Sequence, residues 1–96
     1  MVRRMDQPPW DPEKARLNLA KHGVPFEEAR AALNHPLARR WPDTGHSERE
    51  ERSIVMGFSP TGRPLLIVAS HRSDGMMRII SARRATKREQ HVYEDL

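Results

Sequence analysis

The chain has 96 residues, of which 36% are hydrophobic, 31% are charged and none is cysteine. This length suits one small domain, and we expect residues 1–96 to form a single one. The absence of cysteine excludes disulfide bonds, thiolate zinc sites and a cysteine nucleophile. No apolar run of about 18 residues is present, so the sequence predicts no membrane-spanning helix.

The charge of the chain is positive, with 17 lysines and arginines against 13 aspartates and glutamates. Five of the basic residues stand between positions 78 and 88, where no acid occurs: Arg78, Arg83, Arg84, Lys87 and Arg88. This basic segment 78–88 indicates a partner that carries phosphates, although a merely solvated surface explains it equally well. The first eleven residues lack the apolar core of a secretory signal, so we expect a cytoplasmic protein.

The first predicted element is a helix from Pro12 to His22. Asp11 can accept backbone hydrogen bonds as its N-cap, Pro12 suits the first helical position, and Gly23 can end the helix. Three residues at helical spacing should form its buried face: Ala15, Leu19 and His22.

The remaining predicted elements are short and are separated by turn residues. They are a helix at 26–34, a strand at 37–41, an exposed loop at 43–52, strands at 53–58, 64–69 and 77–81, and a C-terminal helix that opens with Thr86. Thr86 and Glu89 have the spacing of a capping box. Strands joined by tight turns favour an antiparallel meander. The sequence therefore predicts an α+β fold with two N-terminal helices, an antiparallel sheet of three or four strands and a C-terminal helix.

The motifs of metal and nucleotide chemistry are missing from the chain. No glycine-rich loop with a lysine precedes a helix, and the five histidines form no i, i+4 pair. We therefore expect no metal and no cofactor. Arginine, lysine, histidine and glutamate suit the cleavage of RNA, because RNA supplies its own nucleophile, the 2′-hydroxyl.

The alternation of the last predicted strand places Arg78 and Ile80 on one face, with Ile79 and Ser81 on the other. If Ile79 lies in the core, Arg78 points into a groove or into solvent. There it can bind phosphate with its planar guanidinium, or merely extend from the sheet edge.

Several blocks of the sequence occur in an order seen in one known family. They are Trp10-Asp11, Lys21-His22-Gly23-Val24 with Phe26-Glu27-Glu28-Ala29, residues 46–52, residues 78–86, and Glu89 with Tyr93-Glu94. Together they resemble the BrnT toxins over almost the whole chain. One difference is Gln7-Pro8-Pro9, which stands where family members tend to have an N-terminal strand.

The resemblance implies a type II toxin with a RelE-like fold, a ribonuclease that blocks translation. It also implies a BrnA-like antitoxin with a ribbon-helix-helix domain, and binding to DNA only through the toxin–antitoxin complex. The alternative function is a non-catalytic RNA- or protein-binding module that uses the same basic segment. A third is a structural interaction domain.

The resemblance and the basic character of the chain together give two sets of candidate site residues. The candidate catalytic residues are Lys21, His22, Arg52, Arg78 and Arg83. The candidate RNA-binding residues are Trp10, Arg84, Lys87 and Arg88. Structural roles compete with several of these, since Lys21 and His22 suit a helix C-terminus and Trp10 suits the core. Arg52 can likewise form a loop ion pair with Glu51.

Overall fold

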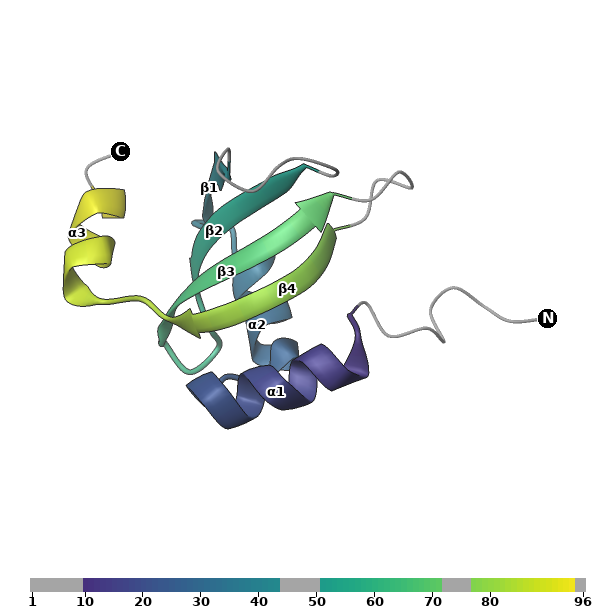
Figure 1. Cartoon of the computed structure of the whole chain (residues 1–96). Coiled ribbons are helices and arrows are strands. Elements are labelled where there is room, and N and C mark those ends of the chain that lie inside the picture. The colour runs from purple at the N-terminus through teal and green to yellow at the C-terminus, as the bar shows by residue number, and fades with distance from the viewer. Residues whose placement is uncertain (1–9, 44–50, 72–76, 95–96) are drawn as a thin grey trace.

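The computed structural model describes residues 10–43, 51–71 and 77–94. Its elements in chain order are α1 (Pro12–His22), α2 (Phe26–Leu33), β1 (Arg39–Pro42), β2 (Arg52–Phe58), β3 (Pro64–His71), β4 (Met77–Arg84) and α3 (Lys87–Glu94) (Figure 1). This order confirms the predicted α+β class. The segment at Gln7–Pro9 and most of the predicted loop at 43–52 lie outside the described residues.

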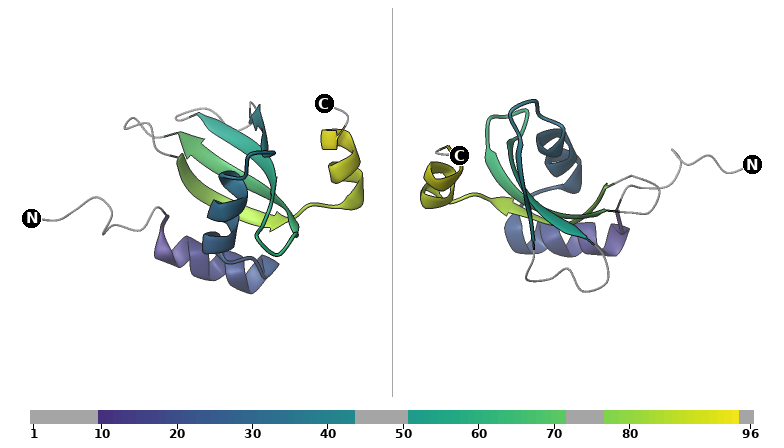
Figure 2. Two further views of the ribbon diagram at one scale, coloured as in Figure 1. Left: turned by 180° about the vertical axis from the view of Figure 1, so that it is seen from behind. Right: turned by 90° about the horizontal axis from the view of Figure 1, so that it is seen from above.

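The four strands form one antiparallel sheet in the order β1-β2-β3-β4, so that β1 and β4 are its edges. Helices α1 and α2 cover one face of this sheet, and α3 lies on the other side, at the end where β4 finishes (Figures 1 and 2). The main core fills the space between the sheet and the first two helices: Val24, Phe26, Ala29, Ala32, Val55, Leu65, Ile67, Ile79 and Ala82. The opposite face, which we call the open face, carries a second and smaller cluster of buried residues: Met56, Leu66 and Ala85.

The ends of α1 follow the sequence signals. The Asp11 carboxylate accepts a hydrogen bond from the Glu13 amide at 2.9 Å, and Gly23 adopts a left-handed conformation with φ of 70°. The C-terminal helix begins with the predicted capping box, because the Thr86 and Glu89 side chains each accept a hydrogen bond from the other residue's amide. Local capping hydrogen bonds therefore define the starts of α1 and α3.

The predicted buried face of α1 is wrong at Leu19, whose surface is 49% exposed. The buried residue of this helix is Asn18. Its side-chain amide donates to the carbonyl oxygens of Val24 and Ala82 and accepts from the Ala82 amide, at 2.8–3.1 Å. Ala82 belongs to the edge strand β4, so Asn18 satisfies backbone groups that no neighbouring strand reaches.

A bulge in β4 overturns the predicted alternation of that strand. Ser81 pairs with Val68 and Ile79 pairs with Ala69, which leaves Ile80 as an extra residue between them. Ser81 consequently lies on the open face, whereas the alternation places it with Ile79 in the core. Arg78 does lie on the open face, as predicted, because Ile79 is buried among the core residues.

Candidate functional site

The open face brings two of the candidate catalytic arginines into one row. Arg52 of β2 pairs with Ser70 of β3, and Ser70 pairs in turn with Arg78 of β4. With about 4.8 Å between neighbouring strands, the Cα atoms of Arg52 and Arg78 lie roughly 10 Å apart. Residues directly opposite each other in a sheet share a face, so the side chains of Arg52 and Arg78 extend from the same face of the sheet.

The third candidate arginine, Arg83, lies on the same face at the other end of β4. Its row runs across the sheet through Leu66 and Met56 to Arg39 of β1. The two rows cross β3 at Ser70 and Leu66, four positions apart, which is a distance of about 13 Å. The open face therefore carries a pair of arginines at each end, with an apolar strip between them.

The side chains of Arg83 and Glu89 form a two-pronged ion pair. The two guanidinium Nη atoms donate to the two carboxylate oxygens at 2.8 and 2.7 Å. These hydrogen bonds lower the pKa of Glu89 from 4.5 to about 2 and raise the pKa of Arg83. Arg83 thus fastens the first turn of α3 to the end of β4, and its guanidinium is half-exposed beside that contact.

The Glu89 carboxylate predicts a stability that depends on pH. Because its folded pKa lies below the usual value, the stabilisation is fully present above pH 4.5 and is lost as the pH falls towards 2. We expect wild-type protein to exceed Glu89→Gln in stability by about 1 kcal/mol at pH 7. Melting temperatures of both proteins between pH 7 and pH 2 should converge below pH 4.5. A gap that stays constant to pH 2 would contradict this assignment.

Two aromatic rings join α3 to the sheet. The rings of Trp41 in β1 and Tyr93 in α3 lie with centroids 3.8 Å apart. Both pack against a small cluster of buried residues on the open face: Met56, Leu66 and Ala85. Burial, followed by the nearby charge of Glu89, raises the pKa of Tyr93 above its ordinary value.

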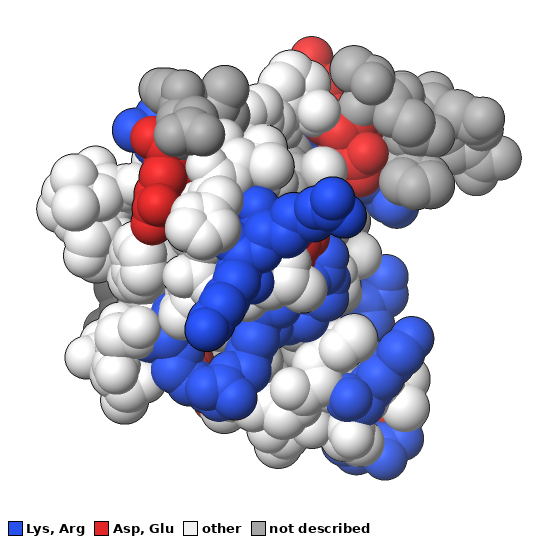
Figure 3. All heavy atoms as spheres, turned by 90° about the vertical axis from the view of Figure 1, so that its left-hand side faces the viewer, with Lys and Arg blue, Asp and Glu red and all other residues white. Residues whose placement is uncertain are grey.

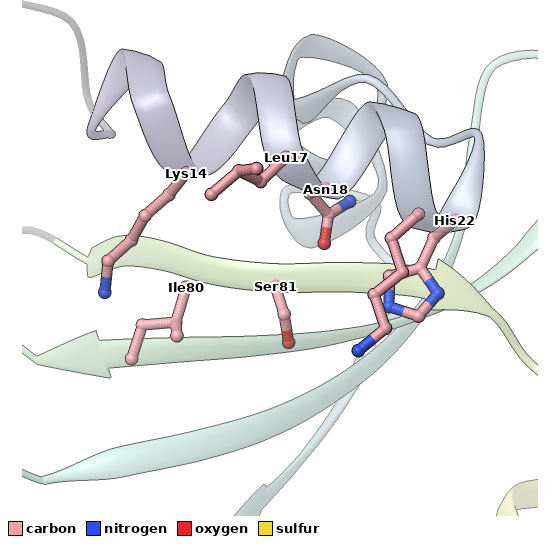
Figure 4. A pocket seen from close by; sticks show the side chains of 7 residues that line it. Lys14, Leu17, Asn18, His22, Ile80 and Ser81 are labelled. Carbon is pink, nitrogen blue, oxygen red and sulfur yellow. The ribbon is translucent and has the colours of Figure 1, made fainter.

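The structure places Lys21 and His22 on α1, outside the sheet that carries the arginine rows. They lie at the C-terminal end of α1 and line a groove of about 290 Å³ between this helix and the outer edge of β4. Figure 4 shows His22 near the end of β4, with Ile80 and Ser81 pointing to the same side of that strand. Ser81 connects the two regions, because it lines the groove and also belongs to the open face.

The candidate RNA-binding residues fall into two groups. Arg84, Lys87 and Arg88 are exposed where β4 ends and α3 begins, and none forms an ion pair with a described residue. Figure 3 shows lysine and arginine side chains gathered on this end of the molecule. Trp10, in contrast, packs edge-to-face on Phe26 with centroids 5.8 Å apart and contacts the main core. Trp10 is partly buried there and packs against the main core from its edge.

Arg39 and Trp41 belong to the open face but are absent from the candidates chosen by sequence. Both lie in β1, where Arg39 pairs with Met56 and Trp41 pairs with Ile54. Their two-residue spacing in a predicted strand was the available signal, since alternate residues share a face. Sequence reasoning also assigned Glu89 only a capping role and missed its contact with Arg83.

The described residues contain neither a candidate metal site nor a candidate membrane-spanning helix. Residues 10–43, 51–71 and 77–94 contain no group of three or more histidine, aspartate or glutamate side chains placed to hold a metal ion. Among the helices described there, none is both long and apolar enough to cross a membrane.

Residues 10–89 match the model of a protein family, the ribonuclease toxin BrnT of type II toxin–antitoxin systems. The chain belongs to this family. No curated protein sequence matches it. The match spans α1 through the capping box of α3, and so includes every candidate site residue. Membership makes the protein a ribonuclease toxin with an antitoxin partner.

Proposed function

We propose that this BrnT-family toxin cleaves RNA without a metal ion, on the open face of its sheet. The observation that carries the proposal is the row formed by Arg52, Ser70 and Arg78, which places two arginines on one surface about 10 Å apart. The half-exposed Arg83 on the same face supplies a further cation. Arginines grouped on one face in this way can neutralise phosphates of a nucleic-acid strand.

The chemistry requires little beyond charge and proton transfer. The RNA 2′-hydroxyl attacks the adjacent phosphorus, and the bond from phosphorus to the 5′-oxygen breaks. The 2′-oxygen loses its proton, and the departing 5′-oxygen gains one. Arginine stabilises the extra negative charge of the transition state, because its planar fork can donate to two phosphate oxygens together. Lys21 and His22 reach the same strand from the edge at Ser81, and we retain them as candidates for proton transfer.

The first turn of α3 supports a role in binding RNA. Lys87 and Arg88 stand at the positive end of a helix dipole, where cations are unfavourable by a few tenths of a kcal/mol each. Glu89 offsets this cost through the capping box. Arg84, Lys87 and Arg88 extend the cationic surface beyond the sheet. We propose that these three residues bind the RNA backbone.

Cleavage by the purified protein in EDTA tests the proposal. We expect single-stranded RNA to be cut at a rate that EDTA leaves unchanged, whereas the same sequence with 2′-deoxyribose throughout should stay intact. Complete loss of cleavage in EDTA, with recovery on adding a divalent ion, would contradict metal independence. Cleavage of the deoxyribose strand would contradict the use of the 2′-hydroxyl.

The consequences for the cell follow from the same activity. We propose that cleavage blocks translation in the cytoplasm, and that the antitoxin is BrnA-like, with a ribbon-helix-helix domain through which the complex binds DNA. Expression of the toxin alone in bacteria should stop incorporation of labelled amino acids, and co-expression of the adjacent gene should restore it. Arrested growth with undiminished protein synthesis would oppose this proposal.

A further inference from the structure

The groove between α1 and β4 contains two lysines around an apolar centre. Lys14 and Lys21 stand seven residues apart on α1, which places them on one face about 10.5 Å from each other. Leu17 lies between them on the helix, and both Leu17 and Ile80 of β4 line the groove (Figure 4). Neither lysine forms an ion pair with a described residue.

The groove arises from two features already described. The bulge at Ile80 breaks the regular alternation of β4, and Ile80 and Ser81 then both point to the groove side of the strand. Asn18 occupies the outward-facing amide and carbonyl of Ala82, so another strand cannot pair with β4 at that residue. A ligand therefore has to bind here chiefly through its side chains.

The composition of the groove favours a peptide over a nucleic acid. Leu17 is 53% exposed, a large apolar surface to leave in water beside a second aliphatic side chain. A nucleic-acid backbone would gain from the lysines but would leave this apolar surface without a matching partner. An apolar side chain flanked by carboxylates matches both parts of the groove.

We propose that this groove binds a segment of the antitoxin in which an apolar residue is flanked by acidic ones. The inference rests on membership of the toxin–antitoxin family and not on the catalytic roles proposed for the open face. The apolar side chain contacts Leu17 and Ile80 in the groove, and the carboxylates pair with Lys14 and Lys21. The segment then also covers His22, which lines the same groove.

Two exposed leucines of α1 provide a matched test. Leu17 is 53% and Leu19 is 49% exposed, but only Leu17 lines the groove. The affinity of the protein encoded by the adjacent gene should be measured for wild-type toxin, Leu17→Glu, Leu19→Glu and Lys14→Glu. We expect Leu17→Glu and Lys14→Glu to weaken binding at least tenfold, and Leu19→Glu to change it less than threefold.

The cleavage of RNA by the same variants, without antitoxin, separates this inference from the proposed function. Leu17→Glu should cut RNA at the wild-type rate. Equal affinities of the Leu17→Glu and Leu19→Glu variants for the antitoxin would overturn the inference, as would absence of binding to wild-type toxin. Loss of RNA affinity in Lys14→Glu with unchanged antitoxin affinity would assign the groove to RNA instead.

Discussion

Replacing Arg78 with alanine is expected to lower RNA cleavage by about 10²- to 10³-fold, the usual effect of removing one donor that stabilises an anionic transition state. Arg78 is exposed on the open face, in one row with Arg52, and forms no ion pair with a described residue. Its loss should therefore leave the fold intact. Cleavage rates and melting temperatures of the purified variant measure the two effects separately.

Arg30 provides the matched control for Arg78. It is an exposed arginine of α2, on the opposite side of the sheet, and also lacks an ion pair with the described part of the chain. Arg30→Ala should cleave RNA at nearly the wild-type rate. Arg78→Lys should recover only part of the activity, because lysine keeps the charge but not the planar fork. A folded Arg78→Ala variant with wild-type cleavage would remove Arg78 from the site.

Replacing Asn18 with leucine is expected to lower the free energy of unfolding by about 3 kcal/mol. Leucine fills a similar volume but leaves the Ala82 amide and carbonyl and the Val24 carbonyl without their hydrogen-bond partner. Each buried group that loses its partner costs about 1–3 kcal/mol, and some recover water at the edge of β4. Urea unfolding of both proteins measures the difference.

Asn34 offers the corresponding control for Asn18. It follows α2, and its side chain is exposed. Asn34→Leu should change the free energy of unfolding by less than about 0.5 kcal/mol, as surface substitutions usually do. If Asn18→Leu proves equally harmless, the hydrogen bonds from Asn18 to β4 do not contribute to stability as the structure indicates.

The predictions that succeeded rest on short-range signals. Asp11 and Gly23 mark the ends of α1, and Thr86 with Glu89 marks the start of α3. Each signal acts between residues a few positions apart, so it can be read before any tertiary contact is known. The order of the elements, and with it the α+β class, follows from these signals and from the turns between strands.

The failures all depend on contacts between distant parts of the chain. The β4 bulge is defined only by pairing with β3, and it moves Ser81 to the open face. Asn18 is buried because β4 presents an unpaired edge to it, although hydropathy alone favours burying Leu19. The periodicity of a single helix or strand contains no information about the element that packs or pairs with it, here β3 for the bulge and β4 for Asn18.

The candidate site shows the same division. Sequence identified Arg52 and Arg78 as candidate residues, but their common row requires the register of β2, β3 and β4. The ion pair between Arg83 and Glu89 likewise requires the chain to turn between β4 and α3. Residue type was therefore predictable, whereas the distribution of the cations over open face and groove was not.

The most direct test of the open face as the RNA surface is an NMR titration. The probe is a single-stranded RNA with 2′-O-methyl groups, which binds but lacks the nucleophile for cleavage. We predict that the largest amide shifts occur at Arg52, Arg78, Ser81 and Arg83, with little change in α2. Shifts concentrated in α2, with β2 and β4 unaffected, would contradict the assignment of RNA binding to this face.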